Sequence, residues 1–139
     1  MWPNLPIEFN VVGTPVSLQS ENARARTEWK ARVLAAARSV IEDGSWAYDE
    51  TRLSVTMFYF PQGEMQGDVD NIVKLTLDAL VPNIYLDDSL IDRVLVQRFS
   101  PDADFSFASP SNALAIAVAM DEPVLFIKIS EVPLEELGA

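Results

Sequence analysis

The sequence predicts a small α/β (α+β) domain, in which helices pack against a single mixed β-sheet. Four segments have the apolar patterns of strands, at residues 5–12, 53–60, 91–99 and 123–130. Two segments between them have apolar residues at helical spacing, at about 22–41 and 71–80. With 139 residues, 49% of them hydrophobic, the chain can bury a core as one domain. The expected order is β-α-β-α-β-β, with residues 1–139 in a single domain.

The first strand is expected at residues 5–12. There Ile7, Phe9 and Val11 lie on one side and polar residues on the other. The glycine, proline and serine residues of 13–17 indicate a loop after it.

A long amphipathic helix is expected next. Ser20 or Asn22 can cap it, and it is expected to run to about Ile41 and to end at Asp43-Gly44. Its predicted core stripe is Ala25, Trp29, Val33, Ala36 and Val40. Its basic residues are Arg24, Arg26, Lys30 and Arg38 on the opposite arc, and Arg32 near the edge of the stripe. Five of the ten Lys and Arg residues therefore lie in one helix, either as a solvated face or as a strip that faces phosphates.

The remaining elements follow from the same patterns. The strand at 53–60 has apolar residues on both faces, so we expect it to be central and covered on both sides. The strand at 91–99 comes third, and 123–130 forms the last strand. Residues 112–120 fit either a short apolar helix or a strand, with their alanine content slightly favouring the helix. The acidic tail after Glu131 is expected to be loosely held.

Residues 67–89, GDVDNIVKLTLDALVPNIYLDDS, gather five carboxylates and one lysine around a short helix. Asp68 and Asp70 are two residues apart in an extended segment, so both side chains leave the backbone on the same side. Asp87 and Asp88 precede the third strand, either as turn residues or as part of a site. Carboxylates that converge from two distant turns form an all-oxygen site, which favours Mg²⁺ or Mn²⁺.

The short helix carries a polar edge. Asp70 is expected at its N-cap, and Asn71, Lys74 and Asp78 fall on one narrow arc. A purely structural interpretation is that Asp70 only caps the helix and that Lys74 only forms helix ion pairs. The combination favours a site, because crowded carboxylates disfavour their own ionisation unless a cation lies among them.

The pattern D-x-D-N-x-x-K-x-x-x-D-A-L, followed by Y-x-D-D-S, resembles the signature of RusA-type Holliday junction resolvases. The matching residues are Asp68, Asp70, Asn71, Lys74, Asp78, Ala79, Leu80, Tyr85, Asp87, Asp88 and Ser89. The resemblance implies a RusA-like fold and a homodimer that cuts branched DNA with Mg²⁺ in recombination and repair. It implies metal binding by Asp68, Asp70 and Asp88, and a role for Lys74 at the scissile phosphate.

Further residues are assigned supporting roles. Asn71, Asp78 and Asp87 are expected to support the catalytic set, with Asp78 orienting the lysine. Tyr85 is interpreted as a core residue. Arg98 holds the place of the basic residue that ends the third strand in the family. Together with the basic face of the long helix, it is expected to contact DNA.

The net charge opposes a DNA substrate. Ten Lys and Arg against 21 Asp and Glu give −11 and a pI near 4.2, whereas DNA-binding proteins usually present basic surface. The loop after the first strand, which is longer and basic in the family, is short and uncharged here. Two alternatives therefore stay open. One is an inactive RusA-fold protein that binds a partner through its acidic surface, and the other is a metal-dependent phosphoesterase for small nucleotides.

The absence of cysteine and histidine excludes disulfides, Cys/His zinc sites and a histidine base. The N-terminal residues lack the basic and apolar regions of a signal peptide. The longest apolar run, at about 113–120, is far shorter than the ~20 residues of a membrane span. A cytoplasmic location without membrane association is therefore expected.

Overall fold

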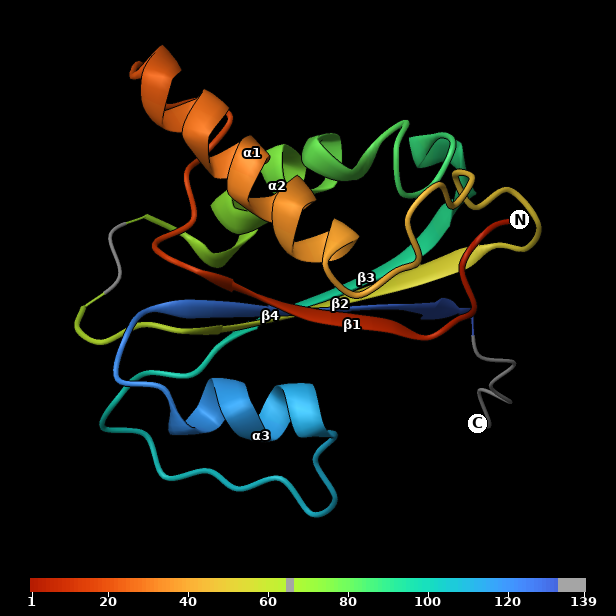
Figure 1. Cartoon of the computed structure of the whole chain (residues 1–139). Helices are drawn as coiled ribbons and strands as arrows, with labels where there is room; N and C mark the ends of the chain where they lie inside the picture. Colours follow the sequence, from red (N-terminus) through yellow and green to blue (C-terminus); the bar gives the residue numbers. More distant parts are fainter. Residues whose placement is uncertain (65–66, 133–139) are drawn as a thin grey trace, which may run out of the picture.

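The structure, a computed structural model, describes residues 1–64 and 67–132. Its four strands are β1 (Ile7–Val12), β2 (Leu53–Phe60), β3 (Ile91–Arg98) and β4 (Val124–Glu131). They form one sheet in the order β1-β4-β2-β3 (Figure 1). β4 is antiparallel to β1 and to β2, and β2 is parallel to β3. The predicted α+β class, with a single mixed sheet, is confirmed.

Helices α1 (Ala23–Arg38) and α2 (Val73–Leu80) lie over one face of the sheet, in contact with each other (Figure 1). A buried hydrogen bond ties them together: Trp29 Nε1 donates to Thr76 Oγ1 over 3.1 Å. The Thr76 hydroxyl donates in turn to the carbonyl of Ile72, 2.7 Å away. Both partners are almost fully buried, so the bond is the polar part of an otherwise apolar helix interface.

Replacing Thr76 with valine keeps the side-chain volume but leaves the indole N–H of Trp29 without its acceptor. We expect Thr76→Val to lower the free energy of unfolding by about 1–3 kcal/mol, the usual cost of a buried unsatisfied donor. Urea denaturation measures this loss. Thr27→Val is the matched control, because its exposed hydroxyl bonds only the Ala23 carbonyl. Equal stability of the two variants would contradict the prediction.

A third helix, α3 (Asn112–Ala119), covers the opposite face of the sheet against β1 and β4 (Figure 1). We expected one layer of helices, so this second layer is a correction, although β2 is central and covered on both faces as predicted. Ser111 begins α3 by accepting a hydrogen bond from Leu114 N over 3.2 Å. Six of the seven phenylalanines gather on this face: Phe58, Phe60, Phe99, Phe105, Phe107 and Phe126.

The end of α1 also differs from expectation. Asn22 caps the helix as predicted, accepting from Ala25 N over 3.0 Å. The helix stops at Arg38 instead of near residue 41, since the Ser39 hydroxyl donates to the Ala36 carbonyl over 2.6 Å and competes with helical bonding. Val40, predicted in the core, is consequently 50% exposed.

The expected loose tail after Glu131 falls mainly on residues 133–139, outside the described part of the chain. Strand β3 lies at the edge of the sheet and leaves Val94 and Leu95 39% and 42% exposed. Within the described residues, no helix is both long and apolar enough to cross a membrane.

Candidate active site and its polar network

The candidate site lies in the connection between the parallel strands β2 and β3. After β2, the chain passes through a loop into a 3-10 turn, η1 (Val69–Ile72), which continues directly into α2. After α2, it returns to a second 3-10 turn, η2 (Asp88–Leu90), which leads into β3. Because η1 also lies against β3, both carboxylate-bearing turns belong to the same edge of the molecule.

The predicted role of Asp70 as a helix cap is wrong. Asp70 lies inside η1, and α2 begins only at Val73 with Ile72 in the N-cap position. The backbone N–H of Asn71 donates to the carbonyl of Asp68 over 3.1 Å, which closes the 3-10 turn before the helix starts. The side chains of Asp68 and Asp70 are exposed and accept no hydrogen bond from any residue that the structure describes.

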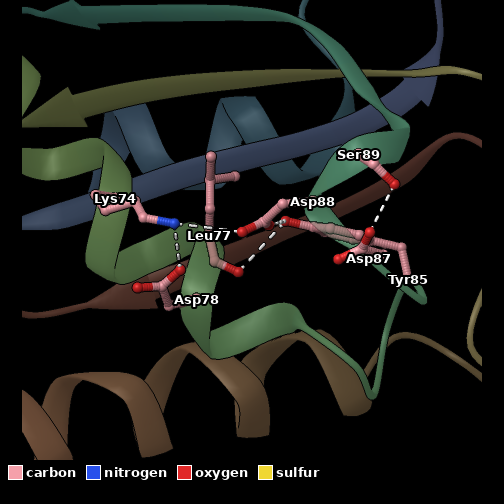
Figure 2. A network of polar contacts seen from close by, with 7 residues as sticks. All are labelled: Lys74, Leu77, Asp78, Tyr85, Asp87, Asp88 and Ser89. Carbon is pink, nitrogen blue, oxygen red and sulfur yellow. Dashed lines mark hydrogen bonds and ion pairs between the residues drawn. The ribbon is translucent and has the colours of Figure 1, made fainter.

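Lys74 contacts one acidic residue of its own helix, Asp78, and one of the turn η2, Asp88 (Figure 2). Its Nζ lies 2.9 Å from Asp78 Oδ1 and 3.3 Å from Asp88 Oδ2. The bond to Asp78 raises the pKa of Lys74 above its ordinary value, and the bond to Asp88 adds to the shift. Lys74 therefore carries its positive charge at neutral pH and holds the Asp88 carboxylate next to α2.

Tyr85 contributes a contact that sequence reasoning missed. Its ring is fully buried, as predicted, but its hydroxyl donates towards both Leu77 O and Asp88 Oδ1, each 3.3 Å away. Burial, together with the negative charges of Asp88 and Asp78, holds the pKa of Tyr85 well above its ordinary value. The hydroxyl thus stays protonated and acts as a donor. The sequence contained a sign of this contact, because a tyrosine expected in the core usually has a hydrogen-bond partner for its hydroxyl.

The two other residues expected to support the site have local contacts. Ser89 Oγ donates to Asp87 Oδ2 over 2.6 Å, and this bond lowers the pKa of Asp87 below its ordinary value. Asn71 lies close to Gly67, where an added Cβ would come within 3.2 Å of Asn71 Nδ2. Gly67 also has a φ of 85°, so a larger residue there would be strained as well as crowded.

The donor chemistry fits a hard divalent cation, since the expected ligands are all carboxylates and two of them have free oxygens. The described residues nevertheless contain no group of three or more Asp, Glu, His or Cys side chains placed to hold a metal ion. In this conformation the charge beside Asp88 is the ammonium of Lys74. Joint binding of a cation by Asp68, Asp70 and Asp88 therefore requires Asp88 to release or share its contact with Lys74. The metal site remains a prediction.

The basic face of α1 is partly used for local contacts. Arg24 pairs with Glu28 over 3.0 Å, and Arg26 donates a hydrogen bond to the backbone carbonyl of Ser20 in the preceding loop. Lys30 and Arg38 are exposed and have no ion pair with any described residue.

This basic face does not border the carboxylate site directly. Thr76, which contacts α1, and Lys74, which contacts Asp88, are two positions apart and so lie about 200° apart around α2. The long helix and the candidate site are consequently on opposite sides of α2. DNA that contacts both must cross the outer surface of that helix.

Arg98 ends β3 as expected. It lines a surface cleft of about 630 Å³ together with Gln62, Gly63 and Glu64 of the loop that leads towards Asp68. Two acidic residues, Glu64 and Asp102, line the same cleft.

Comparison with known proteins identifies the family of the chain. Residues 14–118 match the family described as Endodeoxyribonuclease RusA. The match includes all the predicted catalytic residues, and it leaves out β1 and β4. No curated protein gives a significant match. Since the family match spans well over half of the 139 residues, the chain belongs to the RusA endodeoxyribonuclease family.

Proposed function

We propose that the protein is a magnesium-dependent endonuclease that resolves Holliday junctions and other branched DNA by hydrolysing phosphodiester bonds. Its setting would be recombination and repair. The observation that carries this proposal is the motif Asp68, Asp70, Lys74 and Asp88, which lies inside the family match. Contact between Lys74 and Asp88, which are 14 residues apart, supports the assignment of both to one site.

Asp68, Asp70 and Asp88 would hold the cation, with Mg²⁺ as the expected ion and Mn²⁺ as a substitute. Such an ion, when bound, lowers the pKa of an attacking water and neutralises charge on the phosphate. Lys74 presents its ammonium to the phosphate oxygens, where the interaction strengthens as negative charge develops. Asp78 keeps that ammonium in place through its 2.9 Å contact.

Symmetrical cutting of a four-way junction takes two sites related by a two-fold axis. We therefore propose a homodimer with one site in each subunit. The exposed apolar residues Val94 and Leu95 on the edge strand β3 support this assembly, because such a surface can be covered by a second copy.

The direct test is incubation of the protein with a labelled four-way junction and Mg²⁺ at low salt, beside linear duplex and single-stranded controls. We expect paired cuts near the branch point of the junction and none without the cation. An Asp70→Asn preparation controls for contaminating nuclease. Absence of junction cleavage by the wild-type protein would overturn the proposal.

DNA binding by a chain of charge −11 is expected to depend on local basic surface. Lys30→Glu and Arg38→Glu should each weaken junction binding by about threefold or more, since each reverses an exposed charge available to phosphates. Fluorescence anisotropy in an Asp70→Asn background measures this while keeping the DNA intact. Lys128→Glu makes the same charge change on β4 and serves as the control. Equal effects at all three positions would indicate that only the total charge matters.

The net charge favours, as a second candidate, a catalytically weak RusA-fold protein that binds a partner through its acidic surface. Failure to bind the junction at low salt with Mg²⁺ would support it. Hydrolysis of bis(p-nitrophenyl) phosphate without junction cleavage would instead support a phosphoesterase that acts on small nucleotides.

A further inference from the structure

The position of the Tyr85 hydroxyl is set by the protein core. The ring of Tyr85 has no exposed surface, and the backbone on either side is hydrogen-bonded to Tyr48. Tyr48 N donates to Ile84 O over 2.8 Å, and Leu86 N donates to Tyr48 O over 3.0 Å. A side chain held in this way cannot move far without disturbing its surroundings.

Asp88 is held from two sides by partners of unequal burial (Figure 2). Oδ1 accepts from the hydroxyl of Tyr85, and Oδ2 faces the ammonium of Lys74, each at 3.3 Å. The Lys74 side chain is 59% exposed, whereas Tyr85 is buried. If Lys74 turns towards a phosphate, the tyrosine is the partner that still holds the carboxylate.

We propose that Tyr85 is a positioning residue for Asp88. Its hydroxyl binds one carboxylate oxygen, Oδ1, and so holds Asp88 in place while the other, Oδ2, exchanges the ammonium of Lys74 for a divalent cation. The inference rests on the proposed metal-dependent function, because the cation is the ligand that Asp88 would be positioned to bind. A donor that orients a ligating carboxylate typically affects metal affinity by tenfold or more.

A purely structural role is the alternative. The hydroxyl also donates towards the carbonyl of Leu77, which lies in the last turn of α2, where carbonyls lack helical partners. In that case removal of the hydroxyl would lower stability and leave cation binding unchanged. Cation affinity therefore separates the two roles.

Tyr85→Phe removes the hydroxyl and keeps the ring. The matched control is Tyr48→Phe, since Tyr48 is the bridged neighbour and is also buried. Among the described residues, its hydroxyl shares a hydrogen bond only with Thr51 Oγ1, 2.7 Å away. Mn²⁺ binding, measured by electron paramagnetic resonance without DNA, is expected to weaken about tenfold in Tyr85→Phe. It should stay at the wild-type value in Tyr48→Phe. Equal Mn²⁺ affinity in the two variants would overturn the proposal.

A double variant tests whether Tyr85 acts through Asp88. If it does, Tyr85→Phe should cause no further loss of Mn²⁺ affinity in an Asp88→Asn background. An additive loss would overturn the positioning role.

The outcomes also separate this inference from the proposed function. Weaker Mn²⁺ binding in Tyr85→Phe, with no junction cleavage by the wild type, would support the positioning role and reject the nuclease. Junction cleavage by the wild type, with equal Mn²⁺ affinity in both tyrosine variants, would support the nuclease and reject the positioning role. A wild-type protein that binds no Mn²⁺ would overturn both.

Discussion

The Asp70→Asn variant is expected to lose junction cleavage and to keep its fold. Asp70 is exposed, does not cap α2 and accepts no hydrogen bond from any described residue, so its neutralisation removes no stabilising contact. It also relieves repulsion with nearby carboxylates, so the melting temperature without metal should hold or rise. Mg²⁺ should stabilise the wild type more than the variant. At 100 times the dissociation constant, the wild-type gain is about 2.7 kcal/mol.

Thermal unfolding with and without Mg²⁺ measures this difference, and junction cleavage is measured on the same samples. Asp43→Asn, which neutralises an exposed carboxylate after α1, is the control for charge alone. Equal Mg²⁺ stabilisation of the wild type and Asp70→Asn would remove Asp70 from the metal site.

Lys74→Ala is expected to change cleavage and metal binding in opposite directions. Loss of a charge that stabilises the transition state should lower turnover by about 100-fold or more, with little change in junction affinity. Mn²⁺ should bind more tightly, because Lys74 no longer neutralises Asp88. Stability should fall by less than about 0.5 kcal/mol, since the ion pairs of Lys74 are largely exposed.

Single-turnover kinetics, Mn²⁺ titration and urea denaturation measure these three effects. The same truncation at Lys128 is the control for loss of one positive charge. Unchanged turnover in Lys74→Ala would mean that Lys74 is only part of a helix ion pair.

The elements with regular patterns could be predicted from the sequence. Alternation predicted β1, β2 and β4, the strand at 91–99 was expected as the third in order, and the polar edge of α2 predicted the contact between Lys74 and Asp78. The segment at 112–120 was ambiguous because it is apolar on every side, so its pattern does not indicate which face it covers. The end of α1 was missed because Ser39 bonds the backbone locally, which spacing does not reveal.

The site was only partly predictable. The sequence indicated which carboxylates belong to one candidate site, and the structure adds which other side chains each carboxylate contacts. Asp88 lies between Lys74 and Tyr85, whereas the carboxylates of Asp68 and Asp70 have no partner among the described residues. The cap expected at Asp70 was wrong, because the chain forms a 3-10 turn from Val69 to Ile72 before α2 begins at Val73. Whether the three acidic residues converge on a cation depends on a ligand that the chain alone does not contain.

The strand order has a consequence for synthesis on the ribosome. β4, the most C-terminal of the four described strands, inserts between β1 and β2, and it is translated after the whole β2–α2–β3 connection. A nascent chain that stops before Val124 therefore has β1 without its neighbour and β2 with one side unpaired. Such long-range pairing is slow to form and can take place only when the C-terminal strand has emerged. The connection between β2 and β3, which carries the candidate site, thus rests on a complete sheet only after β4 has been translated.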